Sequence, residues 1–394
     1  MPQRSALAEG WPVWVLAVAQ TLSYASLYYC FAALIFYWHR DLGWAKSTLA
    51  LGPMVSILLG AALAPFVGRL VDTGRGPEAM VFGAMLGAVA LIMMSQVETT
   101  TGWMIAWGLQ GIGQTLSTYE ACFAFFIRRL GPSAKKAIIR VTLVAGFAGT
   151  ISLPAYALLA DLMGWRHALW VGAAVVAFLV VPMNYFGTRA IRRMAPPPQP
   201  KATAAPITDA TGPSRRLRFW LVTAIFTFLA MNQWMILNFL VPIFVMQGYS
   251  EAQAIFAASL VGPAQVVGRF ALMRYEARLN TMSTALITLL TLGFAAGILA
   301  ASGFSYGIVI AFVLIQGSAV GIVTILRPVL IAETMGNENY GETAGRMQVF
   351  SATSGAFAPM VGALFLEGPG LYALIGFSLL LSTLSLLCLQ VLRR

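Results

Sequence analysis

Charged residues are scarce in this sequence: Asp, Glu, Lys and Arg make up only 10% of its 394 residues, against about 25% in an ordinary soluble domain. Histidine occurs twice and cysteine three times. All three cysteines lie in apolar stretches, which argues against a disulfide framework and a cysteine-based metal site. The chain also lacks a phosphate-cradling GxxxxGK[ST] loop and any nucleophile motif. We therefore expect no enzymatic activity, no cofactor and no bound metal.

Apolar residues are abundant: they make up 59% of the chain, and the mean hydropathy is +0.79. Apolar runs of about 18 residues or more are typical of membrane-spanning helices, because a helix satisfies its own backbone hydrogen bonds inside lipid. The sequence therefore predicts an all-α membrane protein with twelve transmembrane helices in two six-helix bundles. The expected spans are 12–37, 48–70, 78–96, 102–127, 139–162, 168–187, 219–246, 252–273, 282–301, 305–331, 347–366 and 369–391.

The segment between the sixth and seventh spans is rich in proline and alanine and is flanked by basic residues. This composition is typical of a flexible linker. We therefore predict an N-terminal bundle at residues 1–187, a cytoplasmic linker at 188–218 and a C-terminal bundle at 219–394.

The orientation follows from the 25 Lys and Arg residues, because cytoplasmic loops carry the excess of positive charge. With both termini in the cytoplasm, only Arg40, Lys46 and Arg166 lie outside, and Arg269 and Arg327 lie within spans. The net charge of +11 is then a signal of topology that needs no nucleic-acid partner. We expect a multi-pass protein of a bacterial-type inner membrane.

A short loop after the second span reads VGRLVDTGRGP. It resembles the Gly-x-Leu-x-Asp motif of the major facilitator superfamily, with Gly68, Leu70 and Asp72 at the matching positions and Arg75 as the nearest basic residue. The resemblance implies the two-bundle fold and transport by alternating access. Glycine lets two helices approach closely, and an Asp can be held by backbone amides or by a basic partner when the halves move. The alternative is a charged loop that only fixes topology.

A narrower resemblance rests on GIGQTLSTYEACFAFFIRR, KKAIIRVTLVAGFAGTISLP and LMGWR. These stretches are similar to monocarboxylate-transporter-like members, in which an arginine on helix 8 clamps a carboxylate substrate. Arg269 stands at the corresponding position, and Gln265 replaces the usual acidic neighbour one turn earlier. Two interpretations stay open: Arg269 faces a substrate cavity, or it extends to the membrane interface.

Glu120 is the one acid predicted well inside a span, and burial of such a group costs roughly 2.5–3.5 kcal/mol or more. It is therefore a candidate for proton coupling, and the alternative is a structural carboxylate that pairs with Arg140 or Arg327. Arg327 precedes Pro328, which weakens its helix by removing a backbone donor. Arg327 is a candidate to bind the substrate. The alternatives are that it marks a hinge in the helix or extends to the membrane interface.

Further polar residues in the spans are candidates to line a central cavity, although helix–helix hydrogen bonding is the commoner role for each one. Gln20, Tyr24 and Tyr28 follow one another at four-residue intervals on the first span. Asn232 and Asn238 lie on the seventh span.

The interpretation that these features favour is a secondary active transporter that moves a small organic solute by alternating access. An organic anion such as a monocarboxylate is the expected substrate, protons are the candidate coupling ion, and we expect a monomer in the lipid bilayer. One alternative is efflux of amphipathic compounds, although the Gly-Pro pair of drug–proton antiporters is split here between Gly149 and Pro154. Another is a non-transporting membrane sensor or scaffold.

Overall fold

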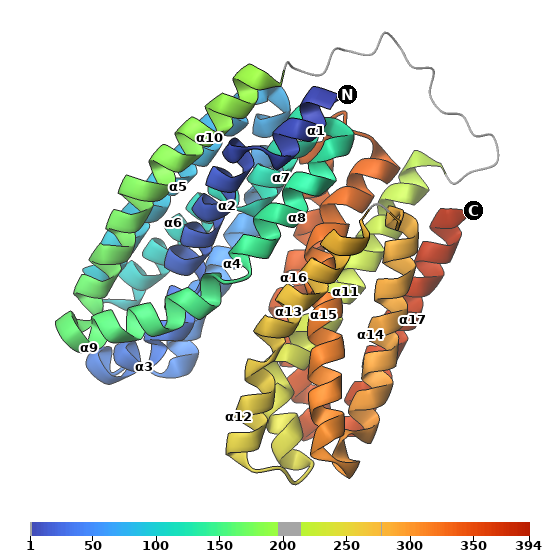
Figure 1. Ribbon diagram of the computed structural model, residues 1–394. Coiled ribbons are helices and arrows are strands. Elements are labelled where there is room, and N and C mark those ends of the chain that lie inside the picture. Colours follow the sequence, from blue (N-terminus) through green and yellow to red (C-terminus); the bar gives the residue numbers. More distant parts are fainter. Residues whose placement is uncertain (1, 196–213, 277) are drawn as a thin grey trace. The chain divides into compact units, whose positions relative to one another are not determined.

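A computed structural model of the protein describes residues 2–195, 214–276 and 278–394, and every regular element among them is a helix (Figure 1). Contacts divide the chain into two units. Unit 1 comprises Met1–Gln199 and Gly336–Arg346, and unit 2 comprises Pro200–Met335 and Met347–Arg394. Most of the predicted linker lies outside the described residues, so the predicted domain boundaries stay a prediction.

Unit 1 contains α-helices joined directly or through short π and 3-10 turns. They are α1 (Pro2–Glu9), α2 (Trp11–Ser23), η1 (Tyr24–Tyr28), α3 (Cys30–Leu42), α4 (Lys46–Leu70), η2 (Val71–Arg75), α5 (Gly76–Ser95), α6 (Thr100–Ser117), α7 (Tyr119–Leu130), η3 (Gly131–Ser133), α8 (Ala134–Ala145), α9 (Ala148–Val175), η4 (Val176–Val180) and α10 (Val181–Met194). Within this unit, α6 packs on α4 and α5, and α2 packs on α8 and α10.

Unit 2 is also entirely helical where the structure describes it. Its elements are α11 (Arg215–Met246), α12 (Glu251–Ser259), α13 (Val261–Tyr275), α14 (Thr281–Ala301), η5 (Ser302–Phe304), α15 (Tyr306–Met335), α16 (Tyr340–Glu367) and α17 (Leu371–Arg393). The helix α13 packs on α15, and α11 and α14 pack on α17. The first turns of α16, up to Arg346, belong to unit 1.

Nine helical runs within the described residues are long and apolar enough to cross a membrane. The run Lys46–Ser95 is interrupted at Gly74, and the run Thr100–Met194 is interrupted at Gly131 and Gly164, where φ is +92°, +56° and +83°. Glycine adopts this left-handed region at no steric cost, whereas other residues are strained there. These three breaks divide the nine runs into twelve segments, and each predicted span lies inside one of them or extends beyond it by at most two residues. The predicted all-helical membrane fold is confirmed.

The fourth predicted span, 102–127, is not one continuous helix. It breaks at Thr118, where the backbone is extended, and α7 begins at the next residue. The Thr118 hydroxyl donates a hydrogen bond to the Gln114 carbonyl and so satisfies one acceptor at the end of α6. The break places Glu120 in the first turn of α7, where a negative charge interacts favourably with the helix dipole.

Each unit has its own apolar core. In unit 1 the core contains a cluster of indole rings, in which Trp38 meets Trp103 edge-to-face at a centroid separation of 4.8 Å. In unit 2 the corresponding core includes Phe244 and Phe312, whose centroids lie 6.2 Å apart. Because lipid tails are as apolar as these side chains, close packing supplies the stability of such cores.

Close packing of α13 on α15 depends on a small residue. A Cβ at Gly268 would meet the backbone of Ser318, whereas a Cβ at Gly262 on the same helix would meet nothing within 4 Å. We expect Gly268→Ala to destabilise the protein by about 1–3 kcal/mol, because the helices must move apart. Gly262→Ala is the matched control and should leave the melting temperature unchanged or slightly higher. Equal melting temperatures for both variants in detergent would contradict this packing.

Candidate functional sites in the two units

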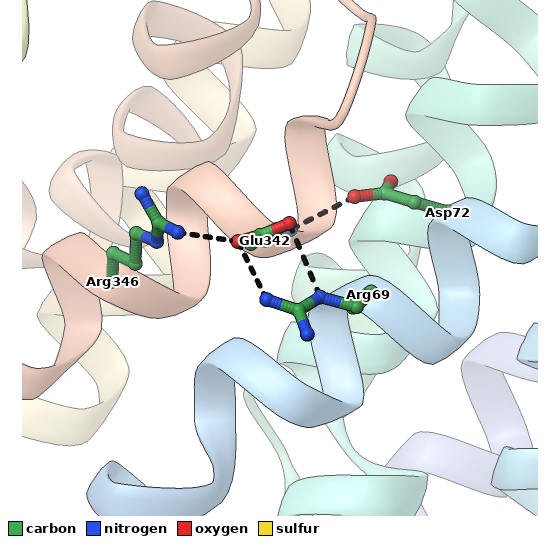
Figure 2. A network of polar contacts seen from close by, with 4 residues as sticks. All are labelled: Arg69, Asp72, Glu342 and Arg346. Atoms are coloured by element: carbon green, nitrogen blue, oxygen red, sulfur yellow. Dashed lines mark hydrogen bonds and ion pairs between the residues drawn. The ribbon is translucent and has the colours of Figure 1, made fainter.

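In unit 1, Asp72 of η2 holds the first turn of α16. Its Oδ1 accepts the Gly341 N–H at 2.9 Å. Its Oδ2 accepts the Glu342 N–H, also at 2.9 Å (Figure 2). The first four N–H groups of a helix have no partner inside the helix, so a carboxylate at this position satisfies two of them. Burial raises the pKa of Asp72, and the two amides and the charge of Arg128 oppose that shift.

The backbones of α4 and α16 approach each other very closely beside this carboxylate. A Cβ at Gly68 would meet the carbonyl group of Gly341, and a Cβ at Gly345 would meet the backbone of Ala64. Glycine is therefore required for this contact. The role of Gly68 in the motif is to let α4 and α16 pack this closely. Leu70 ends α4, and Gly74 provides the left-handed turn within η2.

A network of charged side chains surrounds the same turn. Two nitrogens of Arg69 donate to the Glu342 carboxylate at 2.9 and 3.3 Å, and Arg346 donates to it at 2.6 Å (Figure 2). The Arg69 hydrogen bond lowers the pKa of Glu342. Both arginines are exposed, so each pair contributes little stability, about 0–1 kcal/mol.

Within the motif, Arg69 is the basic residue that reaches the Glu342 carboxylate, while Arg75, which the motif had indicated, is an exposed residue at the end of η2. Sequence reasoning missed Arg69, Gly341, Glu342 and Arg346. No local pattern could have connected them, because Asp72 and Gly341 are 269 residues apart in the chain.

Glu120 lines a shallow pocket in unit 1, whose empty volume of about 270 Å³ includes open solvent. The side chain is half-buried, and the other lining residues are small or apolar apart from Thr115. They include Gly68 and Gly341, so Glu120 faces the same contact of α4 and α16 that Asp72 supports. Arg140, one of its expected structural partners, pairs with Glu9 at 3.3 Å.

The residues predicted on the first span divide between packing and an aromatic cluster. Gln20 is fully buried, and its Nε2 donates to the Ser117 carbonyl at 2.8 Å. Tyr24 lies in the π turn η1, 4.5 Å from Tyr119 and 5.9 Å from Tyr28 between ring centroids. The cluster therefore joins η1 to the start of α7, next to Glu120.

In unit 2, the predicted polar residues of α11 make helix contacts. The Asn232 amide bridges two hydroxyls of α17: it donates to Ser382 at 3.2 Å and accepts from Ser378 at 2.7 Å. Asn238 is exposed and donates to the Trp234 carbonyl of its own helix. Arg327 is half-buried in α15 beside Pro328.

Arg269 of α13 is only 4% exposed. Its Nε donates to the Gly321 carbonyl of α15, and its Nη2 donates to Oε1 of Gln265, each at 3.3 Å. An arginine that extends to the membrane interface would be exposed, whereas Arg269 is buried. The guanidinium lies between two packed helices of unit 2.

A second cavity lies beside this pair, between α11, α13 and α15, with an empty volume of about 320 Å³ including open space at its mouth. Most of its wall is apolar, and its polar lining consists of three glutamines: Gln233, Gln265 and Gln316. Among the residues that the structure describes, no group of three or more His, Cys, Asp or Glu side chains could hold a metal ion.

Comparison with known proteins gives a consistent result. The sequence profile of the Major Facilitator Superfamily matches residues 16–359. The structure is similar to the crystal structure of the transporter FucP in its outward conformation, with a TM-score of 0.71 and 14% identity over 97% of this chain and 99% of FucP. It is also similar to the crystal structure of the human organic anion transporter MFSD10 (TETRAN), with a TM-score of 0.70 and 16% identity over the full length of both chains. No curated protein sequence matches the chain.

Proposed function

The chain belongs to the Major Facilitator Superfamily, and from that premise we propose that it is a secondary transporter of a small organic anion that works by alternating access. The family and fold are those of membrane transporters and not of enzymes. The narrower resemblance to monocarboxylate transporters remains a prediction, as do the inner membrane and the cytoplasmic position of both termini.

The observation that carries the choice of an anion is the buried guanidinium of Arg269. A permanently charged group in a membrane-spanning helix is costly and marks a functional pathway by default. One structure of the same fold is that of an organic anion transporter, which is consistent with this choice.

The direct test is uptake into proteoliposomes that contain the purified protein. We expect saturable uptake of radiolabelled carboxylates, with neutral sugars and hydrophobic amines as the comparison panel. If no compound of the panel is taken up, a membrane sensor or scaffold becomes the better interpretation.

A second candidate function is efflux of an amphipathic compound. The aromatic cluster of Tyr24, Tyr28 and Tyr119 favours it, because clustered aromatic faces bind apolar and cationic solutes. Selective transport of hydrophobic amines in the same panel would favour this candidate and contradict the proposal that the solute is an organic anion.

We propose Glu120 as the proton-coupling residue, because its carboxylate faces a cavity at the contact of α4 and α16. Glu120→Gln keeps the shape and removes the titratable charge. We expect it to retain counterflow exchange at no less than about half the wild-type rate and to lose pH-driven accumulation. Asp161→Asn, an acid-to-amide change elsewhere in unit 1, is the control. Accumulation at the wild-type level in Glu120→Gln would remove Glu120 from the coupling mechanism.

The proposed orientation can be tested with single cysteines at two exposed positions in a cysteine-free background. Arg394→Cys should react with a membrane-impermeant maleimide only after the cells are opened, and Glu98→Cys should react in intact cells. The reverse pattern would invert the proposed topology.

A further inference from the structure

Arg129, in the last turn of α7, is a buried cation without a carboxylate partner. It is only 7% exposed, and its buried Nε has no hydrogen-bond partner. Its guanidinium makes one hydrogen bond among the described residues, from Nη1 to the Ala195 carbonyl at 3.5 Å. An ordinary N–H···O hydrogen bond measures about 2.7–3.2 Å. Buried charges are normally paired, so the part of the chain that the structure describes leaves Arg129 without a counter-ion.

Two further arginines surround this group. Arg128 precedes it on α7, and the Nε of Arg128 is also buried without a hydrogen-bond partner. Arg192 lies in the last turn of α10. Burial and the charges of Arg128 and Arg192 lower the pKa of Arg129, which follows the predicted fourth span. Three guanidinium groups of unit 1 therefore lie close together where α7 and α10 end.

Two carboxylates lie near these arginines, and each has partners of its own. Glu78, in the first turn of α5, pairs with Arg192 at 2.7 Å, and its charge opposes the pKa shift of Arg129. Asp72 interacts with the charge of Arg128, but both Asp72 oxygens accept amides of α16. The three arginines outnumber the two acids, so the cluster keeps a net positive charge for an external anion.

The surface next to the cluster is apolar and aromatic. Phe82 is exposed on α5, one turn beyond Glu78, and Phe186 is exposed on α10. Tyr185, also exposed, lies two turns before Arg192 on the same helix. These two helices pack on each other, so the aromatic side chains continue from the basic cluster along one side of unit 1. Aromatic side chains beside basic residues are typical of the membrane interface, where headgroups and acyl chains meet.

We propose that Arg129 binds the phosphate group of an anionic phospholipid, with Arg128 and Arg192 at the rim of the site and the acyl chains along Phe82 and Phe186. Because Nε is buried, the Nη groups of Arg129 are the donors offered to the phosphate. Arginine N–H groups match phosphate oxygens, and basic pockets between helices on the cytoplasmic side bind acidic headgroups. The inference concerns a lipid partner and does not depend on which solute is transported.

Lipid titrations of the whole protein in detergent test this site. Native mass spectrometry gives the dissociation constant of the first bound phosphatidylglycerol and of the first bound phosphatidylcholine. We expect Arg129→Gln to raise the constant for phosphatidylglycerol by about tenfold or more and to leave that for phosphatidylcholine unchanged, because one charge-assisted contact is lost. Arg193→Gln removes an exposed charge from the same turn of α10 and is the matched control, with a change below about twofold. Equal losses in both variants would reduce the interaction to diffuse attraction and overturn the site.

Glu78→Gln should change binding in the opposite direction. It removes a carboxylate that competes with the phosphate for Arg192, so the affinity for phosphatidylglycerol should rise by about threefold. Glu78 is exposed, so this variant decides the question if Arg129→Gln does not yield a monodisperse protein. Unchanged or weaker binding of phosphatidylglycerol by Glu78→Gln would contradict the proposal.

A merely structural Arg129 would cap the end of α10 through the Ala195 carbonyl. Such a cap stabilises the protein in any lipid, whereas a phosphate site stabilises it only where the anionic lipid is present. We expect the wild type to melt at a higher temperature in phosphatidylglycerol nanodiscs than in phosphatidylcholine nanodiscs, and Arg129→Gln to abolish this difference. A difference that persists in Arg129→Gln would show that Arg129 is only a cap.

Competition separates a lipid headgroup from free phosphate. Inorganic phosphate and the soluble lipid dihexanoylphosphatidylglycerol are titrated, at constant ionic strength, against protein that carries long-chain phosphatidylglycerol. We expect the soluble lipid to displace the bound lipid at a concentration at least about tenfold lower than inorganic phosphate does, because its acyl chains bury apolar surface. Displacement at equal concentrations would assign the site to free phosphate and overturn the lipid.

Discussion

Arg269→Ala is expected to weaken binding of the transported anion by about a hundredfold or more while the protein still inserts and purifies as a single species. The guanidinium is buried and hydrogen-bonded to Gln265 and to the Gly321 carbonyl, so its removal takes away both the positive charge and the orientation of the amide. A hydrogen bond to a charged group contributes about 1.5–3 kcal/mol, and about 1.4 kcal/mol corresponds to a factor of ten. Equilibrium binding of a radiolabelled carboxylate measures the loss.

Arg269→Lys separates charge from geometry. A lysine ammonium is a point charge that cannot reproduce the planar arrangement by which Nε and Nη2 reach Gly321 and Gln265 together. We expect an intermediate loss of affinity, about tenfold. Arg274→Ala removes the same type of residue from the exposed last turn of α13 and is the control for net charge. If Arg269→Ala binds and transports as Arg274→Ala does, Arg269 only joins α13 to α15 and the anion proposal loses its main support.

Asp72→Asn is expected to release the first turn of α16 from η2. The carboxylate accepts two N–H groups at 2.9 Å, whereas an Asn side chain offers one oxygen and turns an NH₂ donor toward the other amide. Loss of one charge-assisted hydrogen bond costs about 2 kcal/mol, which corresponds to an opening equilibrium shifted about thirtyfold. The amides of residues 338–346 should therefore exchange with deuterium about thirty times faster in Asp72→Asn than in the wild type.

The control for this exchange experiment is Asp161→Asn. Asp161 also lies in unit 1, but it accepts the Tyr37 hydroxyl at 2.7 Å and is not bonded to α16. Its substitution should leave the exchange of residues 338–346 unchanged. Equal protection in Asp72→Asn and the wild type would mean that the close backbone contact at Gly68 holds the turn without the carboxylate.

A released turn is also expected to change transport. The proposed role of the motif is to stabilise one state of the alternating-access cycle, so Asp72→Asn should shift the balance between states while expression stays near normal. Accessibility of single cysteines in each unit, with and without the substitution, reports the shift. An unchanged accessibility pattern would confine Asp72 to a local structural role.

Hydropathy alone predicted the all-helical membrane fold correctly, because a chain inside lipid has few ways to satisfy its backbone and a long apolar run leaves only the helix. Short-range rules also explain three of the breaks inside two of the nine helical runs. Gly74, Gly131 and Gly164 adopt positive φ, which few other residues tolerate. The break at Thr118 was not predicted, since Thr is compatible with a helix interior and only the surrounding helices select the extended backbone there.

The sequence by itself thus determined the class of the protein, its apolar spans and its resemblance to the Major Facilitator Superfamily, which the family match confirms. Those properties depend on residues close together in the chain. Tertiary structure alone decided which residues meet. It pairs Asp72 with amides 269 and 270 residues away, joins Arg269 to the Gly321 carbonyl of α15, and brings Gln316 from another helix to the cavity that Gln265 lines. Such partners are set by helix packing, in which a rotation of one residue turns a side chain by about 100°, and no local pattern specifies that rotation.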